Sequence, residues 1–258
     1  MNICREKADA GDGDAMAWFA RMYREGKGVP QNIDKAAEWM RKAADKNVGW
    51  AKNELFDILW RIDTPESLEE MVSVATEFTN AGDAGAMLRL GRAYRDGKGV
   101  EKDFEKSIEW MRKASEKTWW LGREFADNLM KSAKEEHHKE AFELCSRMVE
   151  ERNDGEDIGR LGRMHRDGRG VEKDLDKAAE WMRKAADEGI GWATPELFDI
   201  LWQMDTPDSL KEMRELVVPL AKSGDARAMG HLARMYRDGR GVEKDLKKAA
   251  EWGKGNGI

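Results

Sequence analysis

The sequence predicts an all-α protein: a right-handed α-solenoid of about seven helix hairpins, organised as a 71-residue repeat of two hairpins. Three observations predict this fold. The ten-residue stretch from Tyr94 to Asp103 occurs four times, and its first glycine recurs every 71 residues, at Gly26, Gly97, Gly168 and Gly239. Apolar residues at helical spacing flank each copy, and each copy ends on a residue suited to cap a helix. A fixed period without slippage is typical of stacked repeats.

Each ten-residue copy is expected to be the loop of a helix hairpin. Met87, Leu90 and Tyr94 precede the second copy at helical spacing, and a second apolar-periodic stretch follows it. Gly97 suits the left-handed conformation that ends a helix. The N-cap of the next helix is predicted at the last residue of each copy: Asn32, Asp103, Asp174 and Asp245. Because the Gly-x-Gly follows a helix, it is not interpreted as a phosphate-binding loop.

These hairpins resemble the Sel1-like repeat, a relative of the tetratricopeptide repeat. The third copy carries the pattern as Leu161-Gly162, Gly168-Arg169-Gly170-Val171, Asp174, Lys177-Ala178 and Trp181. Phe19-Ala20 and Leu232-Ala233 replace Leu-Gly in two copies, and His165 replaces a tyrosine. The resemblance covers the four loop-bearing hairpins, about half of the chain. It implies an adaptor that assembles complexes and binds partners on a concave face.

The gaps between these hairpins are long enough for a second, divergent hairpin each. Residues 49–62 read as a helix, and Thr64-Pro65 reads as the start of the next one. Residues 191–224 repeat this pattern closely, whereas residues 119–152 are a diverged copy. Pro219 falls inside a helical pattern and is expected to kink or break that helix.

The two ends of the chain look incomplete against the repeat. Cys4 to Ala10 aligns with the tail of a helix, and Gly253-Lys254-Gly255 interrupts the last helical pattern. Because the repeat runs through the whole chain, residues 1–258 are expected to form a single repeat solenoid domain. A piece of a longer repeat array or protein is favoured over a solenoid with unusual caps.

Composition narrows the classes of function. The net charge is −6 with both signs interleaved, which argues against nucleic acid as a partner. Only Cys4 and Cys145 occur, in different repeats, and no signal-like or membrane-spanning apolar run is found. These features predict a cytoplasmic protein without membrane insertion.

No motif of the sequence predicts catalysis, a metal or another cofactor. His137 and His138 lie at a charged helix start and are expected to be solvated, and His165 and His231 have no metal-ligand spacing. No nucleophile motif is present. The protein is therefore predicted not to be an enzyme and to need no cofactor.

Tryptophan is unusually frequent, with 11 residues. Trp39, Trp110 and Trp181 repeat at 71 residues and are predicted to be buried between hairpins. Trp50 and Trp192 repeat likewise and are also expected in the core. Two readings stay open for Trp60 and Trp202, which either face the concave groove or fill the core.

Eight arginines recur in i, i+3 pairs on the first helix of each loop-bearing hairpin: Arg21 and Arg24, Arg92 and Arg95, Arg163 and Arg166, Arg234 and Arg237. One hypothesis is that they hold the carboxylates of an acidic partner in the groove. The other is an inter-repeat ladder in which Asp57, Asp199 and the loop acids Glu25, Asp96, Asp167 and Asp238 neutralise them. Strict repetition favours the ladder.

The leading functional prediction is a non-enzymatic scaffold that binds a partner protein or peptide in its concave groove. The candidate partner-binding residues are the eight arginines together with Trp60 and Trp202. Two alternatives stay open. One is a carbohydrate or cell-envelope polymer binding module that uses the two tryptophans for stacking, and the other is a helical extension of a larger enzyme.

Overall fold

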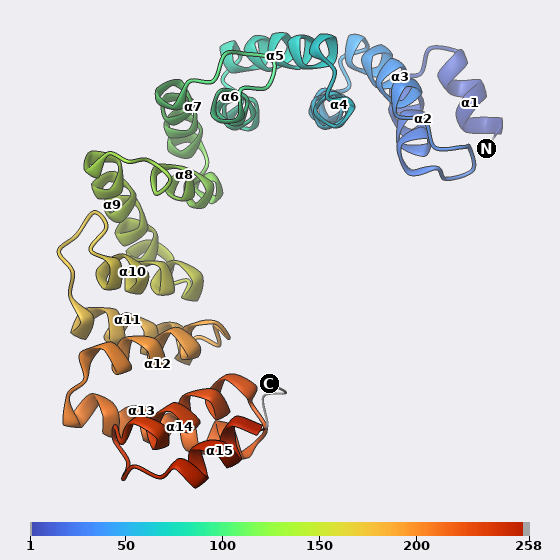
Figure 1. The fold of residues 1–258 in the computed structure, drawn as a ribbon. Helices are drawn as coiled ribbons and strands as arrows, with labels where there is room; N and C mark the ends of the chain where they lie inside the picture. Colours follow the sequence, from blue (N-terminus) through green and yellow to red (C-terminus); the bar gives the residue numbers. More distant parts are fainter. Residues whose placement is uncertain (1, 255–258) are drawn as a thin grey trace. The chain divides into compact units, whose positions relative to one another are not determined.

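A computed structural model describes residues 2–254, which are all-helical and contain no strand. The helices of the first part are α1 (Asn2–Asp9), α2 (Gly13–Glu25), α3 (Ile33–Asp45), α4 (Gly49–Ile62), α5 (Pro65–Asn80), α6 (Ala84–Asp96) and α7 (Phe104–Lys117). They are followed by the 3-10 helix η1 (Trp119–Leu121), α8 (Gly122–Leu129), α9 (Glu135–Arg152), α10 (Gly155–Asp167) and α11 (Leu175–Asp187). The last helices are α12 (Ala193–Met204), α13 (Pro207–Lys222), α14 (Ala226–Asp238) and α15 (Leu246–Lys254) (Figure 1).

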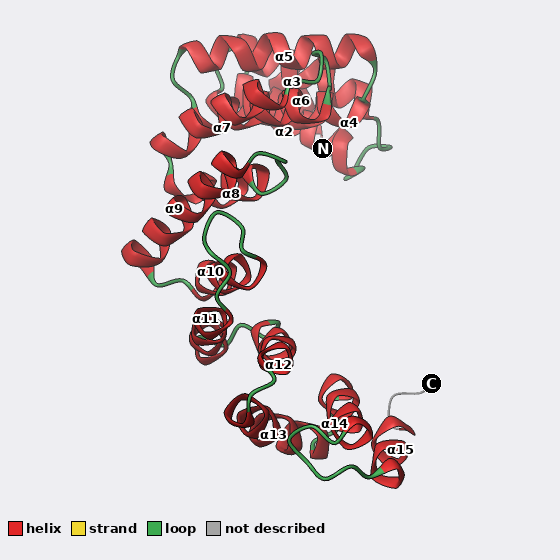
Figure 2. Ribbon diagram, turned by 60° about the vertical axis from the view of Figure 1, so that its left-hand side comes forward, coloured by secondary structure: helices red, strands yellow, loops and turns green. Residues whose placement is uncertain are grey.

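The chain divides into two compact units, one up to Phe125 and one from Ala126. In each unit, helices consecutive in sequence pack on each other, as α2 does on α3 and α10 on α11. In the first unit, α4 and α6 lie on the same side of α5 (Figure 1). Figure 2 shows that the connections between helices are short loops. The prediction of an all-helical, solenoid-type stack of hairpins is confirmed.

The four loop-bearing hairpins have the same backbone. Gly26, Gly97, Gly168 and Gly239 have φ values of 71°, 70°, 67° and 72°, so each first glycine ends its helix in the left-handed conformation. In all four loops the N–H of the N-cap residue donates to the carbonyl of the residue three before that glycine, at 2.9 Å. The predicted equivalence of the four glycines is confirmed.

The second glycine of three of the loops serves a different purpose. A Cβ at Gly99 would overlap the carbonyl of Leu68 on α5, and one at Gly170 would overlap the carbonyl of His138 on α9. Gly241 similarly approaches the carbonyl of Leu210 on α13. These loops therefore press directly on the second helix of the preceding hairpin, which only glycine permits.

The helix starts follow from their capping residues. Asn32, Asp103 and Asp174 each accept a hydrogen bond from the backbone N–H three residues on, at 2.9–3.0 Å. Thr64 and Thr206 form capping boxes with Ser67 and Ser209 and are followed by proline at the first helical position. The diverged copy begins α9 without a side-chain cap at Lys134.

The expectation of a break at Pro219 is wrong, whereas the expected interruption at Gly253-Lys254-Gly255 falls partly outside the described residues. Pro219 neither breaks nor ends α13, which runs on to Lys222. The carbonyl deprived of its hydrogen bond belongs to Glu215, and both residues lie on the exposed side of the helix, where water can replace the bond. Gly253 lies within α15, which is described to Lys254. Gly255 lies outside the described residues.

Beside each repeated tryptophan of the second helices, the fully buried residue is a methionine. Met40, Met111 and Met182 are 0% exposed, one residue after the repeated tryptophans. The predicted burial of Trp39, Trp110 and Trp181 is therefore only partly right, because these rings lie half-buried at the edge of the stack. A lysine three residues on covers each ring, with Nζ 4.4–4.6 Å from its centroid. Trp50 and Trp192 are likewise half-buried.

One histidine differs from expectation, whereas the cysteines do not. His137 is buried rather than solvated, and its Nδ1 lies 2.7 Å from the Ser132 hydroxyl. Cys4 and Cys145 are both free thiols. Burial raises the pKa of the Cys145 thiol to about 12. Among the described helices, none is both long and apolar enough to cross a membrane.

Candidate functional site

The repeated arginines bind glutamates of the following hairpin. Arg24 and Arg21 both pair with Glu54 on α4, the latter at 3.6 Å. In the next copy, Arg92 Nε donates to Glu124 at 2.6 Å, and Arg95 lies 3.8 Å from the same carboxylate.

The third copy repeats the arrangement most completely. Arg163 Nε donates to Glu196 on α12 at 2.9 Å, and Arg166 Nη1 donates to the same carboxylate at 2.8 Å. Each of these arginine pairs therefore clamps one carboxylate that belongs to the next hairpin.

The second arginine of each pair also binds the acid beside it in the loop. Arg95 donates to Asp96 at 2.8 Å, Arg166 to Asp167 at 2.7 Å and Arg237 to Asp238 at 2.7 Å. The hydrogen bond that Arg166 donates to Asp167 raises the pKa of Arg166 and lowers the pKa of Asp167. The expected role of the loop acids is thus observed.

The other expected acids bind elsewhere. Asp57 lies 3.4 Å from Arg89, and Asp199 lies 3.9 Å from His231, so neither binds a repeated arginine. The glutamates that do so were missed in the sequence analysis. A signal for them exists: each follows a tryptophan by four residues, as Trp50–Glu54, Trp120–Glu124 and Trp192–Glu196.

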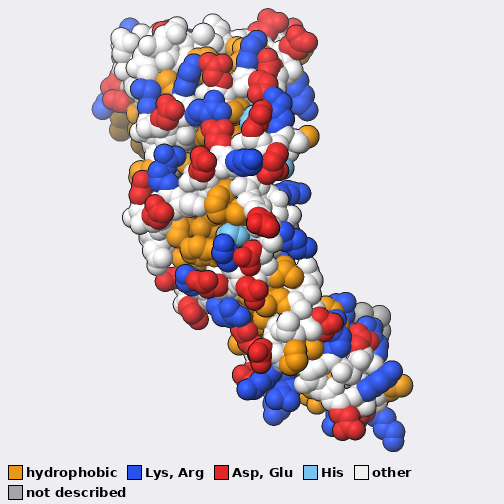
Figure 3. Space-filling model, turned by 90° about the vertical axis from the view of Figure 1, so that its left-hand side faces the viewer, with side chains coloured by type: hydrophobic (Ala, Val, Ile, Leu, Met, Phe, Trp, Pro, Cys, Tyr) orange, Lys and Arg blue, Asp and Glu red, His pale blue; other side chains and the backbone are white. Residues whose placement is uncertain are grey.

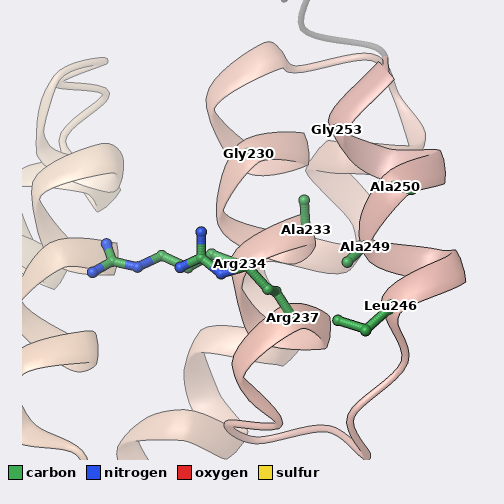
Figure 4. Close-up of a pocket in the computed structure, with 8 residues that line it drawn as sticks. All are labelled: Gly230, Ala233, Arg234, Arg237, Leu246, Ala249, Ala250 and Gly253. Carbon is green, nitrogen blue, oxygen red and sulfur yellow. The ribbon is translucent and has the colours of Figure 1, made fainter.

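The fourth arginine pair has no such glutamate among the described residues. The Arg237 side chain is 61% exposed, against 24% for Arg166 at the equivalent position. The guanidinium carbon of Arg234 lies 4.5 Å from the centroid of Trp202. Both arginines line a cavity of about 680 Å³ between α14 and α15 (Figure 4).

Trp60 and Trp202 have different surroundings. Trp60 is half-buried, stacks on Phe56 with a centroid distance of 6.2 Å, and lies 4.8 Å from Lys98 Nζ. Trp202 is 8% exposed, and Arg240 lies 3.7 Å from its centroid and donates to its carbonyl at 2.6 Å. The Trp202 ring is therefore covered by the protein's own arginines.

A surface of the first unit, formed by α2, α4, α6 and η1, combines exposed tryptophans with a cavity. Trp18 is 55% exposed and meets Trp50 edge to face at 5.8 Å. Asn53 follows Trp50 by one turn of α4 and accepts a hydrogen bond from Arg89 on α6. We call this surface the α2–α4–α6 face and define it by Trp18, Trp50, Asn53, Arg89 and Trp120.

The cavity of the α2–α4–α6 face measures about 500 Å³ and is lined by Asn53, Asp57, Asp83, Gly85, Leu88, Arg89, Arg92 and Trp120. Trp120 is 57% exposed, although a ring of that size is usually well covered. The Asp57 side chain is 60% exposed, whereas that of Arg89 is 17% exposed. The cavity thus presents an indole ring and an accessible carboxylate, with its arginines already engaged.

Many charged side chains in the described part of the chain form ion pairs. No group of three or more His, Cys, Asp or Glu side chains there could hold a metal ion. Figure 3 shows one face of the protein, on which basic and acidic side chains alternate. That alternation is expected where surface charges are paired.

The stacked hairpins, joined by arginine–glutamate contacts, define a helical repeat protein of the solenoid class. The Sel1 repeat profile matches residues 13–48, 84–118, 159–190 and 226–254, just over half of the chain. The chain belongs to the Sel1 repeat family. Members of this family are in general non-enzymatic scaffolds for protein interactions. No curated protein matches the chain.

One solved structure shows the same fold, and a second is similar in sequence. A protective antigen of uropathogenic Escherichia coli strains, described as displaying an SLR fold, has a TM-score of 0.66 and 24% identity over 99% of this chain. This chain spans 56% of that protein. A Sel1 repeat protein from Oxalobacter formigenes is 22% identical, with a TM-score of 0.47 and coverage of 95% of this chain and 84% of its own.

Proposed function

We propose that this protein is a non-enzymatic scaffold that binds a partner peptide on the α2–α4–α6 face. The observation that carries the proposal is the exposed Trp120 at the edge of a cavity of about 500 Å³. Tryptophans that lie beside pockets are frequent anchors of protein interfaces. Membership of a family of interaction scaffolds supports the same conclusion.

The charges of the face indicate which side chains the partner peptide carries. Arg89 is held by Asn53 and Asp57, and Arg92 by Glu124, so these arginines have little capacity left for an acidic ligand. Asp57 is the more accessible group. The peptide is therefore expected to place an apolar side chain against Trp120 and Leu88 and a basic side chain near Asp57.

The carbohydrate alternative receives less support from the structure. It needs Trp60 and Trp202 as open stacking platforms, and the Trp202 ring lies under Arg234 and Arg240. An acidic ligand held by any of the first three arginine pairs would have to displace Glu54, Glu124 or Glu196. The α2–α4–α6 face needs no such displacement.

The test begins with selection of peptides from a random display library on the immobilised protein, followed by fluorescence polarisation with the selected sequences. Trp120→Ala is expected to weaken binding at least tenfold, which corresponds to about 1.4 kcal/mol. Trp119→Ala is the matched control, because Trp119 is 59% exposed and adjacent but does not line the cavity. Failure to select any binder, or equal losses in the two variants, would contradict the proposal.

A further inference from the structure

One core position of the divergent hairpins is polar in the copy formed by α8 and α9. The position lies four residues after the glutamate that binds the arginine pair, and it is Ile58 in α4 and Ile200 in α12. Both isoleucines are fully buried. In α8 the same position is Asn128, which is only 1% exposed. Burial of an amide is less favourable than burial of an isoleucine unless every polar atom is hydrogen-bonded.

Two further core positions of this region have changed in the same way. Cys145 is the eleventh residue of α9 and is 0% exposed, where α5 has Ala75. Asp157 on α10 is also 0% exposed. The equivalent buried residues of the other loop-bearing hairpins are alanines, at Ala15, Ala86 and Ala228. Three consecutive helices thus bury polar groups at positions that are apolar in the other copies.

These buried groups lie within electrostatic range of one another, and all belong to the second compact unit. Burial raises the pKa of the Cys145 thiol to about 12; Arg160 opposes this shift, whereas Asp157 and Asp127 add to it. Arg160 donates a hydrogen bond to Asp127, but its Nε is buried and has no hydrogen-bond partner among the described residues. Charges in an interior are often no more stabilising than apolar residues of the same volume, even when they are paired.

The contact between α9 and α10 includes a second unsatisfied nitrogen. His165 on α10 occupies the position of Tyr94 and is 5% exposed, and its ring meets Phe142 on α9 edge to face at 5.4 Å. Within the described part of the chain, His165 Nδ1 is buried and has no hydrogen-bond partner. A buried nitrogen in this state has lost its water without a replacement, which destabilises the packed arrangement.

The helices of this hairpin also have weaker local signals than their equivalents. Helix α8 has 8 residues, whereas α4 has 14 and α12 has 12. Helix α9 begins after Lys134 without a side-chain cap, whereas α5 and α13 begin with capping boxes. The division between the two compact units falls inside α8. Each feature lowers the expected stability of this hairpin relative to the other divergent ones.

We propose that the α8–α9 hairpin is a local opening unit, which separates from α10 and exposes Cys145 while the other hairpins stay folded. The stability of a repeat protein is approximately a sum of repeat and neighbour terms, so one weak repeat can open without global unfolding. Elements that move when proteins bind are drawn from such regions of low local stability. The proposal does not depend on the function proposed for the α2–α4–α6 face.

The test measures how fast a thiol reagent modifies Cys145 in the folded protein, in a Cys4→Ser background. Because the thiol is fully buried, it reacts only when the hairpin opens. The matched control combines Cys4→Ser, Cys145→Ala and Ala75→Cys, which moves the thiol to the equivalent buried position of α5. Each rate is divided by that of the same protein unfolded in urea. Cys145 is expected to be modified at least tenfold faster than the thiol of the control.

Two variants strengthen the hairpin at independent places. Asn128→Ile restores the residue of α4 and α12 and should slow modification of Cys145 at least tenfold. Lys134→Thr supplies the missing cap at an exposed position and should slow it several-fold. In the parent, the urea dependence of the modification rate should be weaker than that of global unfolding, because a local opening exposes less surface.

Three results would overturn the proposal. The first is modification of Cys145 no faster than that of the thiol in the Ala75→Cys control. The second is a urea dependence equal to that of global unfolding, which would show that Cys145 is reached only when the whole protein unfolds. The third is an unchanged rate in both Asn128→Ile and Lys134→Thr, which would separate the opening from the buried amide and the missing cap.

Discussion

The hairpins α10–α11 and α14–α15 have nearly the same sequence pattern but different surroundings. Both end the first helix at a left-handed glycine and cap the second with an aspartate, Asp174 or Asp245. In the first of these hairpins Met182 lies against Gly162 of α10 and α12 packs on α11, and both Met182 and Ala178 are fully buried. The corresponding side of α15 leaves Leu246 exposed. The sequence of a repeat therefore determines the backbone of its hairpin. The neighbouring hairpin determines whether the apolar face of that hairpin is buried or exposed.

The largest expected effect is a difference in the free energy of unfolding between a variant of a buried residue on α11 and a variant of an exposed residue on α15. Met182→Ala should lower the free energy of unfolding by about 2–5 kcal/mol, because it leaves a cavity beside Gly162 of α10. Leu246→Ala should change it by less than about 0.5 kcal/mol, since its side chain is exposed. Urea denaturation with a shared m-value measures both. Similar losses for the two variants would contradict the distinction.

A smaller effect is expected at the arginine clamp. Glu196→Gln removes the carboxylate shared by Arg163 and Arg166, and because these side chains are partly exposed the loss should be about 0.5–1 kcal/mol. Asp238→Asn, which removes the bound acid of the exposed Arg237, should cost less. The difference should shrink in 1 M salt, where charges are screened within about 3 Å. A salt-independent difference in urea midpoints would argue against an electrostatic clamp.

The smallest effect at neutral pH concerns His165, which occupies the position of Tyr236. Desolvation lowers the pKa of buried His165 in the folded state, and Lys177 lowers it further, whereas Asp174 opposes the shift. Below pH 6.5 the unfolded chain therefore binds more protons than the folded one, so stability falls as the pH decreases from about 6.5 through the folded-state pKa.

His165→Tyr should remove this acid sensitivity while changing stability little at pH 8. Urea midpoints of parent and variant measured between pH 8 and pH 5 check the expectation. Tyr236→His serves as the comparison, because position 236 is less buried and should acquire a weaker pH dependence. Parallel pH profiles for the parent and His165→Tyr would show that another group governs the acid response.

Much of the fold could be predicted because its signals are local. In each hairpin a loop glycine ends the first helix, a residue six positions later caps the second, and apolar residues follow at helical spacing. The same set recurs every 71 residues. Helix α4 begins and ends at the predicted residues, and Thr64-Pro65 caps α5 as expected. The candidate site was less accessible to such reasoning: the repeated arginines and the loop acids were found, but the glutamates that bind the arginines were not.

The sequence alone determined the repeat, the hairpins and their caps, because these depend on contacts between residues close in the chain. Tertiary structure decided which side chains are buried, since burial depends on what the neighbouring hairpin supplies. It placed Met182 rather than Trp181 in the core, covered Trp202 with Arg240, and left Trp120 exposed beside a cavity. It also gave the second loop glycines their role, because only packing brings Gly99 against the carbonyl of Leu68.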